Sequence, residues 1–478
     1  MSARAHGIAM LAIMVMTVDI AAAQSQLLES TTSSTTSPTG EPFDVTTGFV
    51  RVPELRADEG ARPSTIDLAI VRVRRAGVTA HRSAHIILAG GPGDSGVNLV
   101  MGLVRQGGPA VWQLFEGDVI GIDQRGTSRS RPNLETPVRY DLPLDKPGSM
   151  DEWLPRIRQA SRNVAEAFRA RGIRLEAYNT RESADDVAEV GRTLGYERIT
   201  IWGRSYGSHL ALATLARHPA IVDRLILISP EGPNHTWKRP AQVDAVIDQL
   251  TARGATDLKD NIQGVLTRLR ERPATVLVTD PISGVHTAVV LGAFDVQWIV
   301  AQALGDPRLV ATLPVAFREM AQDKFDRMAQ IALLRRSRAG VESAMKHMMD
   351  LSSGVSADRQ RQIQNEARDA VLGNAINFPA MFLEDAWAPV TDLGVDFRRP
   401  IHSTVPTLIL VGDLDPRTPV VNAREIAATL SAAQVVVLEN ATHQFDVFGS
   451  SIIRDVIDRF FRRAPVADKV VLPRVTFQ

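Results

Sequence analysis

Short unbroken runs of apolar residues narrow the possible folds of this chain more than any other feature. Such runs are typical of strands that are buried on both faces of a sheet. They lie at residues 86–89, 118–122, 199–202, 225–228, 407–411 and 435–438. Helical patterns fall between most of them, for example at 182–194 and 208–217. Because alternating strands and helices build parallel sheets, the pattern predicts an α/β fold with a mostly parallel sheet wrapped by helices.

The alternation of strands and helices stops after Pro230, and this break predicts the domain organisation. Residues 234–400 are mostly helical in pattern, with one hairpin expected around 280–284. We expect this segment to form a cap inserted between two strands of the sheet. The core domain would then consist of residues 48–233 and 401–478.

The N-terminal residues have the three-part layout of a secretory signal peptide. Arg4 precedes an apolar stretch at 8–18, and small residues end the segment at Ala23. The apolar stretch has about half of the roughly 20 residues that a membrane-spanning helix needs. Residues 1–23 are therefore predicted to be removed on export, to the periplasm or the medium. The Ser/Thr-rich residues 24–47 are predicted to be a flexible leader.

The composition argues against several classes of function. The chain of 478 residues carries 54 basic and 54 acidic side chains and has no basic run. This balance argues against nucleic acid or an acidic membrane surface as a partner, and leaves a small substrate. The chain has no cysteine, so a thiol nucleophile and a cysteine-ligated metal are impossible. The chemistry predicted below requires no cofactor and no metal.

A strand, a tight turn and a helix are predicted around one serine. The apolar run 199–202 is followed by Gly203, Ser205 and Gly207 in the pattern G-x-S-x-G, and then by an Ala/Leu-rich helical pattern. In such a turn the serine has a strained backbone and projects from the sheet edge, and the glycines let strand and helix approach. The pattern alone is weak, because an ordinary glycine turn also shows it. The strand before it and the helix after it favour Ser205 as a nucleophile.

A serine nucleophile needs a base to take its proton and an acid to orient that base. His443 is the candidate base among ten histidines because it follows the buried strand 435–438. Ligand-facing residues gather at the carboxyl ends of parallel strands. The acid is expected between the serine and the histidine, in the turn after the preceding buried strand. Asp415 is our choice and Asp413 the alternative, although either could simply form the turn.

Backbone N–H groups are predicted to bind the negative charge that develops on the substrate oxygen. The N–H of Tyr206 lies at the start of a helix, where the dipole favours an anion. A second N–H is expected from the glycine-rich loop 90–93, which follows a buried strand. A turn without function uses the same residue types.

A second serine motif, Gly-Asp-Ser-Gly at residues 93–96, has to be weighed against this prediction. It matches the serine motif of trypsin-like proteases, but those need a β-barrel chain, and here a parallel-sheet pattern follows. It also matches the N-terminal block of another esterase class. That class needs Asp-x-x-His near the C-terminus, and residue 440 is asparagine. Neither class is therefore expected.

With these residues placed, the chain resembles the α/β-hydrolase superfamily, and within it the proline iminopeptidase and tripeptidyl aminopeptidase family of serine exopeptidases. The resemblance covers nearly all of the chain after residue 23. It rests on motifs in the same order as in the family: Gly-Gly-Pro-Gly at 90–93, Asp-Gln-Arg-Gly at 123–126 with Ser130, the turn 203–207, the acid turn 412–419 and Thr442-His443. The resemblance implies that Gly91 is the key donor of the first loop.

Four positions depart from the family pattern without removing an atom of the triad. Ala89 stands where the family has histidine, and a family glycine is replaced at Ser128, Arg204 and Thr442. Residues around the loop and the turn shape the pocket. These four departures are therefore expected to affect which substrate the pocket binds.

The resemblance implies an exported aminopeptidase-like enzyme that cleaves N-terminal residues or short peptides through an acyl-enzyme. In this family, carboxylates of the cap bind the free α-amino group of the substrate. Glu231, just after a predicted strand, is the candidate here, and Glu384 and Asp385 are weaker ones. Two alternatives stay open at this point. One is an esterase that acts on small carboxylic esters, and the other is a binding protein that has lost catalysis.

Overall fold

The computed structural model describes residues 26–56, 64–78 and 82–478. The predicted signal peptide, residues 1–23, lies outside the described residues. Of the helices in the described ranges, none combines the length and the apolar character needed to cross a bilayer.

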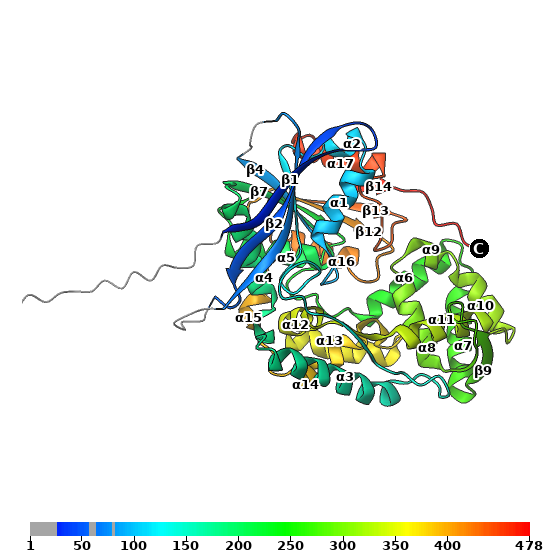
Figure 1. Cartoon of the computed structure of the whole chain (residues 1–478). Coiled ribbons are helices and arrows are strands. Elements are labelled where there is room, and N and C mark those ends of the chain that lie inside the picture. The colour runs from blue at the N-terminus through cyan, green and yellow to red at the C-terminus, as the bar shows by residue number, and fades with distance from the viewer. Residues whose placement is uncertain (1–25, 57–63, 79–81) are drawn as a thin grey trace, which may run out of the picture.

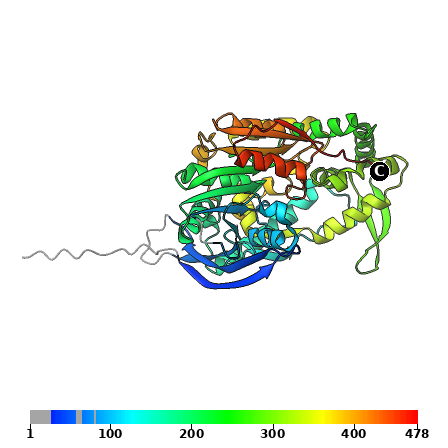
Figure 2. The ribbon, with the colours of Figure 1, turned by 90° about the horizontal axis from the view of Figure 1, so that it is seen from above.

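A ten-stranded sheet forms the centre of the core domain (Figure 1). Its strands, in spatial order, are β1 (Leu27–Thr36), β2 (Pro42–Pro53), β3 (Thr65–Arg75), β5 (Asp118–Ile122), β4 (Ser83–Leu88), β7 (Arg198–Arg204), β8 (Val222–Ile228), β12 (Thr407–Gly412), β13 (Ala433–Glu439) and β14 (Lys469–Val471). Strands β5 to β14 pair in parallel, and β1, β2 and β3 join them by antiparallel pairing. Figure 2 shows the sheet running from the blue N-terminal strands at one edge to the orange and red C-terminal strands at the other.

Helices cover both faces of this sheet because its central strands are apolar on both sides. One face packs against α1 (Gly96–Gln106), α2 (Pro109–Trp112) and α17 (Ser451–Phe461). The other face packs against α4 (Thr180–Thr193), α5 (Tyr206–Arg217) and α16 (Val420–Ala427). Each of the six predicted apolar runs lies in a strand, except that Ala89 follows the end of β4. The predicted fold class is therefore confirmed.

The cap, which follows β8 and precedes β12 in the sequence, has its own apolar core. It contains α6 (Pro240–Ala252), α7 (Leu258–Glu271), the hairpin β9 (Ala274–Thr279) and β10 (His286–Leu291), α8 (Ala293–Ala303), α9 (Pro307–Val310), α10 (Leu313–Ala321), α11 (Asp326–Arg338), β11 (Gly340–Ser343), α12 (Ala344–Ser353), α13 (Ala357–Asp369), α14 (Glu384–Trp387) and α15 (Gly394–Phe397). The hairpin lies where the sequence predicted one.

The cap also takes in a segment that the sequence had assigned to the core domain. Strand β6 (Glu135–Arg139) pairs with β11, and α3 (Met150–Ala170) lies against α14 (Figure 1). A fully buried Arg336 fastens this segment, because its Nε donates to Asp295 Oδ1 at 2.8 Å and its Nη1 to the carbonyl oxygen of Pro143 at 2.8 Å. The cap is therefore not one continuous insertion.

The prediction of a flexible leader over residues 24–47 is wrong for most of that segment. Residues 27–36 form β1, and β2 already begins at Pro42, so the core domain starts before residue 48. Residues 29–40 lack large apolar side chains, but an edge strand gains its order from backbone pairing with its neighbour. Side chains add to this pairing, since Thr32 Oγ1 lies 2.9 Å from Thr46 Oγ1.

Candidate active site

Ser205 lies at the sharp turn between β7 and α5. Its backbone has φ 53° and ψ −123°, a region that costs a non-glycine residue free energy and recurs at functional sites. The flanking glycines permit the turn. A Cβ atom at Gly207 would collide with the carbonyl oxygen of Leu88, and one at Gly203 would collide with the carbonyl oxygen of Gly207. The sequence therefore folds here into the predicted strand–turn–helix unit.

Ser205, His443 and Asp415 meet at the carboxyl ends of β7, β13 and β12. Ser205 Oγ lies 3.1 Å from His443 Nε2, and His443 Nδ1 donates to Asp415 Oδ2 at 2.8 Å. Asp415 also accepts from the Thr418 backbone N–H at 2.9 Å and from its hydroxyl at 2.7 Å. Burial raises the pKa of Asp415, but the His443 charge and these hydrogen bonds outweigh it and lower the pKa to about 2. The ionised carboxylate fixes the tautomer in which Nε2 can accept the serine proton.

The structure separates the two aspartates that the sequence left as alternatives. Asp413 Oδ2 accepts from Arg253 Nη2 at 2.7 Å, and Asp413 Oδ1 accepts from the Asn440 backbone N–H at 2.9 Å. Its hydrogen-bond partners are thus Arg253 and Asn440, whereas Asp415 is the partner of His443.

The two predicted oxyanion donors lie beside the nucleophile. Tyr206 is the first residue of α5, so its N–H has no partner within the helix. The loop at residues 90–93 packs against the turn, since a Cβ at Gly90 would lie 3.3 Å from Ser205 Cβ. Gly91, with φ +106°, lines the same cavity as Ser205. Two backbone N–H groups next to a serine are what stabilisation of a tetrahedral intermediate requires.

Asp123, in the Asp-Gln-Arg-Gly motif, holds the chain that follows the oxyanion loop. Its carboxylate accepts from the backbone N–H of Val97 at 3.1 Å and from that of Arg129 at 3.2 Å. Ser95, the serine of the Gly-Asp-Ser-Gly motif, donates to the same carboxylate and caps α1 by accepting from the Asn98 N–H at 3.0 Å. Ser95 is thus a helix cap.

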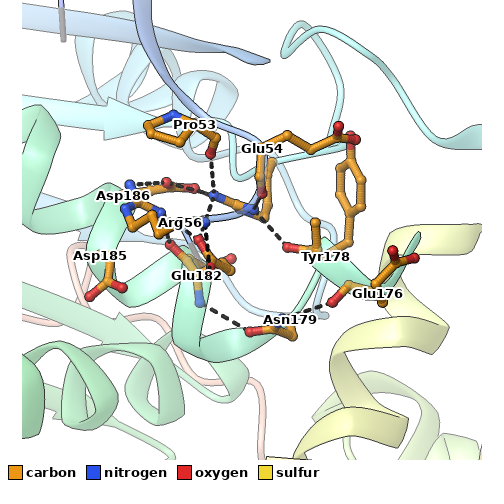
Figure 3. A network of polar contacts seen from close by, with 12 residues as sticks. Pro53, Glu54, Arg56, Glu176, Tyr178, Asn179, Glu182, Asp185 and Asp186 are labelled. Atoms are coloured by element: carbon orange, nitrogen blue, oxygen red, sulfur yellow. Dashed lines mark hydrogen bonds and ion pairs between the residues drawn. The ribbon is translucent and has the colours of Figure 1, made fainter. Parts of the chain in front are cut away.

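Arg125 of the same motif is fully buried and belongs to a network of charged side chains. Figure 3 shows Arg56, Glu182 and Asp186 of this network. The Nε of Arg125 donates to Asp186 at 2.8 Å and its Nη1 to the carbonyl oxygen of Glu54 at 2.6 Å. Arg56 donates from Nη1 to Glu182 and from Nη2 to Asp186, both at 2.8 Å. Each guanidinium has carboxylate partners, so this network ties β2 and the β5 turn to α4.

Ser205 opens into a cavity of about 530 Å³ between the sheet edge and the cap. Glu231 lines this cavity and forms an ion pair with Lys238, whose Nζ also donates to the carbonyl oxygen of His235 at 3.0 Å. Asp350 of α12 lines it too. Burial, followed by the charge of Glu231, raises the pKa of Asp350 to about 7. The cavity thus holds two carboxylates close enough to interact.

Sequence reasoning placed some of these residues and missed others. Glu384 and Asp385 are exposed at the start of α14 and are absent from the cavity lining described here. Asp350 was missed because nothing in its helical pattern marks it, and only the packing of α12 brings it to Glu231. Two cavity arginines, Arg335 and Arg417, were missed for the same reason. Within the described residues, no group of three or more metal-ligating side chains is placed to hold a metal ion.

The chain is similar to a known protein family and to several known proteins. Residues 86–445 match the sequence pattern of the α/β-hydrolase fold family. The protein named "Putative hydrolase YuaR" from Escherichia coli (strain K12) is 23% identical over 442 residues, which are 85% of this chain and 84% of that protein. The tripeptidyl aminopeptidase of Streptomyces lividans is 27% identical over 202 residues, which are 40% of this chain and 36% of that enzyme. These matches confirm the resemblance inferred from the motifs.

One solved structure that aligns with this chain is that of an iminopeptidase. The proline iminopeptidase of Mycobacterium smegmatis is 15% identical, and the alignment covers 83% of this chain and 95% of that one with a TM-score of 0.39.

Proposed function

Because this chain belongs to the α/β-hydrolase fold family, we propose that it is a serine hydrolase that releases N-terminal residues or short peptides from peptide substrates. The observation that carries the proposal is the pair of contacts that join Ser205 to His443 and His443 to Asp415. The similarity to a tripeptidyl aminopeptidase supports a peptide as the substrate.

In the proposed mechanism, Ser205 Oγ attacks the carbonyl carbon while His443 Nε2 takes its proton. The N–H groups of Tyr206 and Gly91 bind the oxyanion. His443 then gives the proton to the leaving amine, and the acyl-enzyme remains. Water attacks this ester with His443 again as the base, which frees the acid product and restores Ser205. Asp415 stabilises the imidazolium in both halves.

We propose that the carboxylates of the cavity bind the ammonium group of the substrate. An ammonium group is costly to bury unless carboxylates pair with it. Glu231 already pairs with Lys238, which offsets its charge. The Asp350 carboxylate has neither a hydrogen bond nor an ion pair within the described chain, so it supplies the charge that Glu231 alone does not. Glu231 then fixes the position of Lys238 at this end of the cavity.

The competing function is hydrolysis of small esters, because a serine triad cleaves esters and amides alike. The deciding measurement is kcat/KM for an aminoacyl arylamide, its N-acetylated twin and a simple aryl ester. We expect the free amine to be preferred over the acetylated twin by about tenfold or more, equivalent to at least 1.4 kcal/mol. Equal rates on both arylamides, or turnover of the ester alone, would favour the esterase. No turnover of any of them would favour a binding protein.

We also propose that the protein is exported. The support is the layout of residues 1–23, with a basic residue, an apolar stretch and a small-residue end. Protein recovered from outside the cytoplasm is expected to begin at or near Gln24. Active protein inside the cytoplasm with an intact Met1 would contradict export.

A further inference from the structure

The cavity of Ser205 contains more positive than negative side chains. Its basic residues are Lys238, Arg335, Arg338, Lys346 and Arg417, and its acidic residues are Glu231, Glu342 and Asp350. The two lysines pair with two of the acids, Lys238 with Glu231 and Lys346 with Glu342. Among the described residues, neither Arg335 nor Arg417 forms an ion pair with a carboxylate. Arginines that line a cavity without a carboxylate in direct contact are suited to bind an anion.

Helix α8 holds these two arginines in place. Gln302 Oε1 accepts from Arg417 Nη2 at 2.6 Å, and the guanidinium of Arg335 lies over the ring of Trp298 at 5.7 Å. These contacts use few of the five N–H donors that each guanidinium carries. Burial and then the charge of Arg417 lower the pKa of Arg335, and burial lowers the pKa of Arg417 against the opposing effect of the nearby Asp415 carboxylate. The two like charges are therefore near each other, which disfavours the empty site and favours one that holds an anion.

The arginines lie on the histidine side of the nucleophile. A Cβ atom at Gly305 would lie 3.2 Å from Arg417 Nε and 3.6 Å from His443 Cβ, so Arg417 is next to the residue that protonates the leaving group. The acidic end of the cavity lies on the helix side. The backbone N–H of Glu231 donates at 2.8 Å to Ser208 Oγ, in the first turn of α5. The cavity thus has Arg417 on the histidine side of Ser205 and Glu231, with its partner Lys238, on the helix side.

We propose that Arg335 and Arg417 bind the C-terminal carboxylate of the leaving peptide. The proposal rests on the peptidase function inferred above and narrows its substrates to short peptides with both termini free. The ammonium group lies toward Asp350 and the α-carboxylate toward the arginines, with the scissile carbonyl at Ser205 between them. Two guanidinium groups offer a carboxylate charge-assisted hydrogen bonds. A long peptide places its carboxylate outside the cavity and loses this interaction.

The test compares a short peptide that has a free C-terminal carboxylate with the same peptide as its C-terminal amide. For the unaltered protein we expect kcat/KM to favour the carboxylate by about tenfold or more. In Arg335→Gln and in Arg417→Gln, each measured separately, this ratio is expected to fall toward one. Arg327→Gln is the matched control, because Arg327 is an exposed arginine on the same helix as Arg335 and is absent from the lining of the cavity. It is expected to keep the ratio.

Equal kcat/KM for the two peptides in the unaltered protein would overturn the carboxylate site. So would a preference that persists in both arginine variants. Arg335→Gln is remote in sequence from the acid turn, so it remains informative if Arg417→Gln disturbs Asp415. Thermal unfolding of each variant checks that it is folded.

A second pair of substrates separates failure of this site from failure of the peptidase function. Aryl esters are used whose leaving phenol carries either a carboxylate or a carboxamide. If no peptide is cleaved but both esters are, the peptidase proposal fails. A preference for the carboxylate ester that is lost in Arg335→Gln then still supports the site, and equal ester rates overturn it.

Discussion

Two groups of charges in this molecule differ in how completely they are paired. Around Arg125 and Arg56, each guanidinium has a carboxylate partner. Arg125 is fully buried and therefore does not contact solvent. In the cavity of Ser205, Asp350 and the pair Arg335 and Arg417 have no ion-pair partner within the described chain. A buried charge is costly without a partner. The first group therefore stabilises the fold, whereas the second is completed only when a charged ligand binds.

This comparison leads to a general expectation. Changes in the paired network should lower stability and leave the catalytic groups in place, whereas changes at the triad or in the cavity should lower activity or alter specificity at nearly constant stability.

Ser205→Ala is expected to lower kcat by roughly 10⁴- to 10⁶-fold, because only the oxyanion donors and substrate binding would still help. The midpoint of unfolding should hardly change, since the hydroxyl's described partner is His443 of the triad. A fluorophosphonate probe, followed by mass spectrometry of the adduct, should label Ser205 in the unaltered protein. Labelling of Ser95, or undiminished labelling of the variant, would contradict this assignment.

Asp415→Asn is expected to cost about 10⁴ in kcat, because an amide no longer fixes the required tautomer of His443. Asp413→Asn is the matched control and should cost far less, since Asp413 pairs with Arg253. Steady-state kinetics of the two variants decides between them. The reverse ranking would transfer the role to Asp413.

Arg125→Ala is expected to lower the free energy of unfolding by about 3–5 kcal/mol, because it removes one partner of a buried ion pair. The control is Arg51→Ala. Arg51 pairs with Asp67 on the surface, and such exposed pairs contribute about 0–1 kcal/mol. Urea unfolding measures both. A loss of activity in Arg125→Ala without a loss of stability would mean that the paired network belongs to the site.

The sequence predicted those parts of the site that are encoded locally. The strand–turn–helix unit around Ser205 and the loop position of His443 follow from residues that are neighbours in the chain. Asp413 and Asp415 could not be separated, because both occupy one turn and only its folded geometry points one of them at the histidine. Asp350, Arg335 and Arg417 could not be found, since three separate segments bring them to one cavity.

The fold, too, was predictable only where it is encoded by residues that are neighbours in the chain. Unbroken apolar runs indicate buried parallel strands, and each of the six runs lies in a strand. Strand β1 was missed because its order comes from pairing with β2 and not from burial of its own side chains. The contribution of α3 to the cap was missed because it depends on contacts with residues far along the chain.

The smallest predicted effect is a change of specificity with pH that depends on Asp350. Burial and the charge of Glu231 raise the pKa of Asp350 to about 7, so the carboxylate is mostly protonated at pH 5.5 and mostly ionised at pH 8. Only the ionised form attracts an ammonium group. The ratio of kcat/KM for a free-amine arylamide to that for its N-acetylated twin should therefore fall by up to about tenfold as the pH drops from 7.5 to 5.5. The ratio cancels the titration of the triad, because both substrates use it.

Asp350→Asn should lower this ratio and remove its dependence on pH. A raised pKa in the folded state also means that the folded protein binds a proton more tightly than the unfolded chain, so the contribution of Asp350 to stability falls as the pH rises from about 4 to 7. The variant should therefore be at least as stable as the unaltered protein at pH 8. A variant that keeps the pH-dependent ratio would show that Asp350 does not meet the ammonium. One that is markedly less stable at pH 8 would show that the carboxylate has a partner in the fold, and the contrast between paired and unpaired charges would not hold.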